Sequence, residues 1–204
     1  MPSSTLIIYL KAPREGYVKT RLAKSIGPEG ALKAYRKLVA RQLKEIPSSV
    51  QIFIDFTPAD AGPEFRQWLG DVHKYRPQID GDLGQKLSHS TATAFQQGAE
   101  ICICIGGDCP GLSERHILEA SKALEQGADL VVGPCEDGGY YLIGIKEPRA
   151  ELFEGIPWSA PTTLKVTLEK AAEKNLKVQQ LETLYDVDDI YSLQRAISAG
   201  YLPE

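Results

Sequence analysis

The sequence predicts an α/β fold, a three-layer α/β/α sandwich around a mostly parallel, Rossmann-like sheet. Residues 101–105 (ICICI) are apolar at every position, which is typical of a strand buried on both faces of a parallel sheet. Other strand-like runs alternate along the chain with amphipathic helical runs. Loops that contain glycine and acidic residues follow several of these strands, at the sheet edge where such folds bind ligands.

Length and composition fit one domain spanning residues 1–204. The chain has 204 residues, of which 43% are apolar, so it can bury a substantial core. Its formal charge is −4 and it has no long basic run, so nothing in the composition indicates a general nucleic-acid binder or a membrane-surface protein. Without a leader or a bilayer-length apolar run, we expect a cytoplasmic protein with no membrane partner. The sequence carries no signal for oligomeric state.

The four cysteines do not form a regular framework. They stand at positions 102, 104, 109 and 135, with no CxxC pair. Cys102 and Cys104 lie two residues apart on one strand and are best interpreted as small core residues. We therefore expect no disulfide bonds.

The first predicted strand, residues 5–10 (TLIIYL), is followed by a basic loop, residues 11–22. The loop contains Lys11, Arg14, Lys19 and Arg21, together with one proline and one glycine. Lysine charges and forked arginine hydrogen bonds can hold a polyphosphate. An ordinary solvated loop would have the same composition, so both interpretations stand. The loop matches neither the Walker A pattern nor GxGxxG.

The next elements follow from periodicity. Residues 27–30 begin a helix whose apolar positions recur every three or four residues, and Pro47 ends it. Residues 50–56 alternate as a strand does, 60–69 form a short helix, and 72–79 form a weaker strand. Residues 80–84 (DGDLG) open a helix over 85–97. The free N–H groups of that helix start could bind an anion or a base edge, or the loop could be an ordinary helix start.

Asp108 follows the central strand 101–105 directly. Two glycines precede it and Pro110 prevents the strand from continuing, so the carboxylate should stand at the carboxyl end of the sheet. There it could hold a divalent cation on nucleotide phosphates, or be only a turn acid. Ser113 is the expected N-cap of the next helix.

The last third of the chain contains two further acidic loops. Residues 134–139 (PCEDGG) separate strands 129–133 and 140–145 and predict either a cleft floor or a hairpin turn. Trp158 precedes a helix over 162–174 and is either a packing residue or a base-stacking platform. After a strand at 176–181, the aspartates at 186, 188 and 189 open the last helix, as a metal site or a capping cluster.

Together these segments resemble the nucleotide-diphospho-sugar transferase superfamily, with its glycosyltransferase A-type fold. The most similar group is a poorly characterised bacterial glycosyltransferase-like family related to molybdenum-cofactor and 2-phospholactate nucleotidyltransferases. Six motifs occur in the family's order: KAPREGYVKTRLA (11–23), GDLGQKL (81–87), GGDCPGL (106–112), GPCEDGGYYLIGI (133–145), LFEGIPWS (152–159) and DVDD (186–189).

The resemblance implies a role for each motif. Asp108 and Asp188 would hold Mg²⁺ or Mn²⁺, with Asp186 as the second choice for the later ligand. Asp108, Lys19, Arg21 and Asp137 would be the catalytic residues. Nucleotide binding would involve Pro13, Arg14, Gly16, Lys19 and Arg21 in the first loop, and Gly81, Asp82 and Gly84 on the base and ribose side. Glu136, Asp137, Gly138 and Gly139 would face a small-molecule acceptor.

The implied activity is a metal-dependent transfer of a glycosyl group from a nucleotide sugar to the acceptor. Two departures from the family patterns bear on this. The first loop has one glycine, where nucleotidyltransferases are glycine-rich, which points away from a nucleoside triphosphate donor. Asp108 lies in Asp-Cys-Pro, where glycosyltransferases have DxD, which points toward nucleotidyl transfer onto a phosphorylated small molecule. A non-catalytic nucleotide-binding protein is the third alternative.

Overall fold

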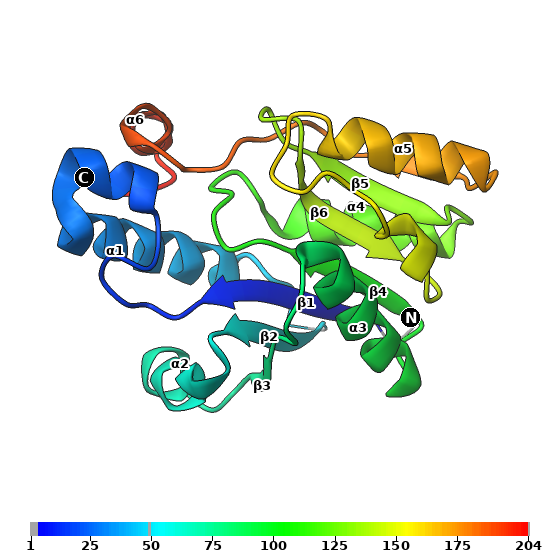
Figure 1. The fold of residues 1–204 in the computed structure, drawn as a ribbon, viewed down its shortest axis with the longest axis horizontal. Coiled ribbons are helices and arrows are strands. Elements are labelled where there is room, and N and C mark those ends of the chain that lie inside the picture. Colours follow the sequence, from blue (N-terminus) through cyan, green and yellow to red (C-terminus); the bar gives the residue numbers. More distant parts are fainter. Residues whose placement is uncertain (1–3, 49, 204) are drawn as a thin grey trace.

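A computed structural model describes residues 4–48 and 50–203. Within them, seven strands form one sheet in the order β3-β2-β1-β4-β6-β5-β7 (Figure 1). The strands are β1 (Ser4–Lys11), β2 (Gln51–Thr57), β3 (Lys74–Pro77), β4 (Ile101–Ile105), β5 (Leu130–Pro134), β6 (Tyr140–Ile145) and β7 (Val178–Gln180).

The sheet is parallel except at β6. β1 pairs in parallel with both β2 and β4, with Ile7 opposite Phe53 on one side and Cys104 on the other. β6 runs antiparallel to β4 and β5, because residues 135–139 form a hairpin turn between β5 and β6. The hairpin interpretation of that loop is therefore correct. Because β1 and β4 are parallel neighbours, their carboxyl ends meet at one edge of the sheet.

Helices cover both faces of the sheet, as predicted for a three-layer sandwich (Figure 1). Side chains of α1, α2 and α4 pack on one face, and those of α3 and α5 pack on the other. α6 packs against α1 in a separate apolar cluster. The helices are α1 (Thr20–Lys44), α2 (Gly62–Leu69), α3 (Leu83–Gln96), α4 (Glu114–Glu125), α5 (Thr163–Glu173) and α6 (Ile190–Ser198), with 3-10 turns at Ala59–Ala61 and Ala150–Leu152.

The start of α1 differs from the prediction. The expected loop over residues 11–22 ends earlier, because α1 begins at Thr20. Gly27, with φ 74° and ψ 163°, interrupts the helix, and Pro28 starts its second part. The Gly-Pro signal at 27–28 thus marks a kink inside a longer helical segment, since proline fits the first turn of a resumed helix.

All four cysteines are free and buried, which confirms the core interpretation of Cys102 and Cys104. Among the described residues, no helix combines the length and apolar character needed to cross a bilayer.

β2 contains a buried charge that its alternating pattern did not indicate. Asp55 shares a face of the sheet with Phe53 and is only 2% exposed. Arg76 of β3 donates from Nε to Oδ1 at 2.8 Å and from Nη2 to Oδ2 at 3.1 Å, and Ser90 of α3 donates to Oδ2. The pair links the edge strand β3 and helix α3 to the centre of the sheet.

We expect the substitution Asp55→Ala to lower the free energy of unfolding by about 3–5 kcal/mol, because it leaves the Arg76 guanidinium buried without its partner. Urea denaturation measures the difference. Ser90→Ala is the control, since it removes one hydrogen bond to the carboxylate and should cost less, about 1.5–3 kcal/mol. Equal costs for the two variants would contradict a structural role for the ion pair.

Candidate functional site

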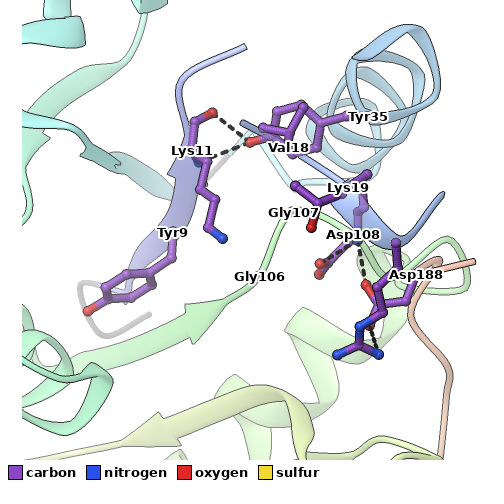
Figure 2. Close-up of a pocket in the computed structure, with 11 residues that line it drawn as sticks. Tyr9, Lys11, Val18, Lys19, Tyr35, Gly106, Gly107, Asp108 and Asp188 are labelled. Carbon is purple, nitrogen blue, oxygen red and sulfur yellow. Dashed lines mark hydrogen bonds and ion pairs between the residues drawn. The ribbon is translucent and has the colours of Figure 1, made fainter. Parts of the chain in front are cut away.

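A cavity of about 270 Å³ lies where β1 and β4 end (Figure 2). β1 and the first loop form one side, α1 forms another, and the loop after β4 forms the floor. The lining residues are Tyr9, Lys11, Val18, Lys19, Thr20, Arg21, Tyr35, Gly106, Gly107, Asp108 and Asp188. Segments from the start, middle and end of the chain thus meet in one cavity.

A buried ammonium group joins the two predicted metal ligands. Lys19 Nζ lies 2.7 Å from Asp108 Oδ2 and 3.2 Å from Asp188 Oδ1. Dashed lines mark the interactions of these residues in Figure 2. The Lys19 side chain is 6% exposed, whereas those of Asp108 and Asp188 are 36% and 43% exposed. Arg21 is exposed and reaches Asp188 Oδ2 at 3.5 Å. Four of the residues predicted from the sequence therefore form one ion-pair network.

Lys19 is unusual in both backbone and charge. It precedes α1 in the left-handed region, with φ 47° and ψ 47°, a conformation that residues with a side chain rarely adopt. Burial lowers the pKa of Lys19, but the carboxylates of Asp108 and Asp188 more than offset this, so the net shift is upward. The ammonium group therefore remains charged at neutral pH.

Backbone pairing brings the late aspartates to this cavity. The Val187 N–H donates to the Asp108 carbonyl at 3.0 Å. Three residues earlier, the Leu184 N–H donates to the Pro134 carbonyl at 3.0 Å, and the Leu184 carbonyl accepts from the Glu136 N–H at 2.9 Å. The segment 184–188 therefore lies between the loop after β4 and the β5–β6 hairpin.

Asp186 lies deeper than Asp188. The Cys135 thiol donates to its Oδ2 at 3.3 Å, while its Oδ1 is buried and has no partner among the described residues. Burial, followed by the charge of Asp108, raises the pKa of Asp186 to about 8. One ligand atom each from Cys135, Asp137 and Asp186 lie within 4.8 Å of one another. Only its place in the acidic loop 134–139 pointed to Cys135 from the sequence.

The donor set fits the hard divalent cation that the fold implies. Asp108 and Asp188 offer carboxylate oxygens, which Mg²⁺ and Mn²⁺ prefer. Both carboxylates already share a cation, the Lys19 ammonium, and both remain partly open to the cavity. Asp186, whose buried Oδ1 has no hydrogen-bond partner among the described residues, lies instead with Cys135 and Asp137.

A second cavity of about 380 Å³ adjoins the first and shares Arg21 and Asp188 with it. Two predicted acceptor residues, Glu136 and Asp137, line it. Glu136 binds the Arg195 guanidinium at 2.7 and 2.9 Å. Asp137 accepts a hydrogen bond from Gly139 N–H at 2.8 Å, within the hairpin turn.

Gly138, a third predicted acceptor residue, lies at a point of close backbone packing. Its φ is +87°, and a Cβ there would lie 2.1 Å from the Pro161 carbonyl oxygen. The backbone of the hairpin and that of residue 161 could not approach so closely with any other residue at position 138.

Three predicted nucleotide-binding residues of the first loop do not line the cavity. Arg14 turns toward α2, where its Nε lies 3.0 and 3.1 Å from the Glu64 carboxylate oxygens. Pro13 is buried, and Gly16 occupies a turn with φ 73°. Of this loop's predicted residues, the cavity therefore contains only Lys19 and Arg21.

The glycine loop before α3 also lies outside the first cavity. Asp82 caps α3 by accepting from Gln85 N at 2.8 Å. Gly81 has φ 127°. Gly84 packs so closely that a Cβ would lie 2.3 Å from the Phe153 carbonyl oxygen and 3.0 Å from Trp158. Asp82 and Gly84 line a separate cavity of about 590 Å³ between α3 and residues 150–155.

Tyr35 is a cavity residue that the sequence did not identify. Its hydroxyl accepts from Lys11 N–H at 3.0 Å and lies 2.9 Å from the Lys11 carbonyl, which fixes the end of β1 (Figure 2). In the sequence it was only one apolar position of a helix. Trp158 packs edge-on against Tyr140 and contacts the core cluster under α3 and α5. These contacts agree with the packing interpretation of this residue.

Three solved structures illustrate what the chain resembles. A candidate nucleotide-diphospho-sugar transferase from Desulfovibrio desulfuricans G20 is 30% identical, with a TM-score of 0.88 over 98% of this chain and 97% of that one. CMP:2-keto-3-deoxy-manno-octonic acid synthetase, complexed with CTP, is 12% identical, with a TM-score of 0.62 over 98% of this chain and 100% of the synthetase chain. Rv0371c of Mycobacterium tuberculosis H37Rv, in complex with manganese, is 14% identical, with a TM-score of 0.57 over 97% and 99%.

The second and third structures, at these identities, share the fold alone. No curated protein sequence matched the chain. A family model matches residues 39–160, more than half of the chain, and describes an uncharacterized protein conserved in bacteria (DUF2064). The chain belongs to the DUF2064 family and has the fold of the nucleotide-diphospho-sugar transferases.

Proposed function

We propose that the protein is a metal-dependent transferase that moves a glycosyl group from a nucleotide sugar to a small acceptor. The observation that supports this best is the Lys19 ammonium between Asp108 and Asp188, at the open end of the two central strands. This arrangement places a positive charge next to two ligands for a divalent cation. A bound diphosphate needs both, because its own negative charge must be neutralised.

In this proposal the first cavity binds the donor. Lys19 and Arg21 contact the phosphate oxygens, and Asp108 and Asp188 hold Mg²⁺ or Mn²⁺. The cation, when bound, neutralises the charge that develops on the leaving nucleoside diphosphate. The Lys19 ammonium contacts the phosphate oxygens as well and adds a second positive charge to offset theirs.

The second cavity binds the acceptor, since it shares Arg21 and Asp188 with the first. Asp137 lines it and is the candidate base. The acceptor hydroxyl oxygen forms the new bond to the anomeric carbon while the bond from that carbon to the diphosphate breaks. Asp137 takes the hydroxyl proton, and the nucleoside diphosphate leaves.

Nucleotidyl transfer is the second candidate, because the CTP-bound synthetase has the same fold. In that reaction an acceptor phosphate oxygen attacks the α-phosphorus of a nucleoside triphosphate, and pyrophosphate leaves. The same two carboxylates and Lys19 would serve it, while Asp137 would only position the acceptor.

A panel of nucleotide sugars and nucleoside triphosphates, each with and without Mg²⁺ or Mn²⁺, separates these candidates by thermal shift. A ligand at about 100 times its Kd stabilises the fold by roughly 2.7 kcal/mol. A metal-dependent shift with a nucleotide sugar supports glycosyl transfer, and one with a triphosphate supports nucleotidyl transfer. Binding without turnover of any donor would indicate a nucleotide-binding protein, and no shift with any donor would contradict the proposal.

We expect Asp108→Asn to weaken metal-dependent nucleotide binding by about tenfold or more, because the amide removes one anionic ligand. Isothermal titration calorimetry with and without Mn²⁺ measures the effect. Asp71→Asn is the control, since Asp71 is an exposed acid that pairs with Arg66. Unchanged affinity in the Asp108 variant would remove this residue from the proposed ligands.

The carboxylates of this site also predict a pH dependence. The pKa of Asp186 rises from 3.8 to about 8 on folding, so the folded state binds its proton more tightly than the unfolded state. Stability of the metal-free protein should therefore fall as pH rises from about 4 to about 8.

Asp186→Asn removes this dependence. With a chelator present, we expect the variant to match the wild type near pH 4 and to be more stable by several kcal/mol at pH 9, since a pKa difference of one corresponds to about 1.4 kcal/mol. Urea denaturation at the two pH values provides the comparison. The same difference between the proteins at both values would mean that Asp186 titrates normally.

A further inference from the structure

One face of α1 forms the support behind the first cavity. Tyr35, Val39 and Gln42 are spaced by four and three residues and therefore share this face. Tyr35 holds the end of β1 through Lys11. Gln42, which is 1% exposed, donates from Nε2 to the Gly106 carbonyl at 3.1 Å. The helix thus contacts both strand ends that form the cavity.

The loop that carries Asp108 is fixed at three alternate carbonyl groups. Gln42 Nε2 donates to the Gly106 carbonyl, and Val187 N–H donates to the Asp108 carbonyl at 3.0 Å. Arg41 Nε donates to the Pro110 carbonyl at 2.7 Å. Two consecutive residues of α1 therefore hold the loop on either side of Asp108. The Arg41 guanidinium is itself placed over the Tyr201 ring, 4.7 Å from the ring centroid.

The loop is also tightly packed. A Cβ at Gly107 would lie 2.4 Å from Leu10 Cδ2 and 3.3 Å from Val39 Cγ2. The backbone beside Asp108 therefore rests directly on the core, with little room to take another path.

Gln42 is a costly residue at its position. Its Oε1 is buried and has no hydrogen-bond partner among the described residues, and an apolar side chain of similar size would avoid that cost. What the amide supplies in return is a hydrogen bond to the loop, two residues before Asp108. A buried polar group that lowers stability while fixing a functional loop indicates a role in the site.

We propose that Gln42, assisted by Arg41, is a positioning residue that orders the Gly106–Pro110 loop and so sets the Asp108 carboxylate for cation binding. This inference rests on the proposed function, in which Asp108 is a metal ligand. Gln42 does not line the cavity, so its effect passes through the Gly106 carbonyl.

The test uses Gln42→Met, which keeps the length of the side chain but cannot donate. Leu38→Met is the matched control, a volume-conserving change at a fully buried position of the same helix. Two quantities are measured in both variants and in the wild type: hydrogen–deuterium exchange of the segment 104–112, and the affinity for Mn²⁺ alone by electron paramagnetic resonance.

We expect Gln42→Met to speed exchange in this segment and to weaken Mn²⁺ binding by about tenfold, while Leu38→Met changes neither. Unchanged exchange in Gln42→Met would overturn the inference, as would faster exchange with unchanged Mn²⁺ affinity. Equal effects of the two variants would also overturn it, since they would indicate a general loosening of α1. If the wild type did not bind Mn²⁺, the proposed function would fail, and the exchange data would still decide whether Gln42 orders the loop.

Discussion

The ammonium group of Lys19 is the contact on which the site depends. Asp108 and Asp188 come from segments 80 residues apart and converge on Lys19, and the buried Asp186 also acts electrostatically on that ammonium group. Without a cation between them, their like charges would repel at short range in a partly buried setting. Lys19 supplies that cation in the absence of metal, and its strained backbone angle places the side chain there.

The fold provides the rest of this arrangement through neighbouring backbone. β1 and β4 are adjacent and parallel, so the basic loop after one and the acidic loop after the other begin side by side. The segment 184–188 is then attached to the acidic loop through Val187 and to the hairpin through Leu184. Two adjoining cavities result, with Arg21 and Asp188 at their boundary. This geometry suits the transfer of a group from one bound molecule to another.

The sequence predicted those parts whose cause is local. β4 is apolar at all five positions and is followed by glycine and proline, so its end and the place of Asp108 were evident. Lys19, Arg21 and Asp188 were also predicted, and the structure brings them to Asp108. α1 was predicted to start late because Gly27 and Pro28 look like a helix beginning, although they mark a kink in a longer helix. Asp55 fitted an alternating strand, and nothing near it indicated that Arg76 would neutralise it.

The parts that could not be predicted depend on contacts between distant segments. Arg14 is as basic as Lys19, but Glu64 binds it and turns it from the cavity. Gln42 looks like any polar helix residue until its helix is placed behind Gly106. The glycines of the loop before α3 fitted either ligand contact or an ordinary helix start, and only the structure shows that Gly84 packs closely on the Phe153 carbonyl.

In the proposed function, Asp108 and Asp188 hold a divalent cation in place of the Lys19 ammonium, which then contacts the nucleotide phosphates. Anomalous diffraction from crystals grown with Mn²⁺ and the nucleotide that gives the largest thermal shift tests it most directly. We expect one anomalous peak at about 2.0–2.5 Å from an oxygen of each carboxylate, with Lys19 Nζ moved onto a phosphate. A bound nucleotide with Lys19 still bridging the two carboxylates, and manganese absent from them, would contradict it.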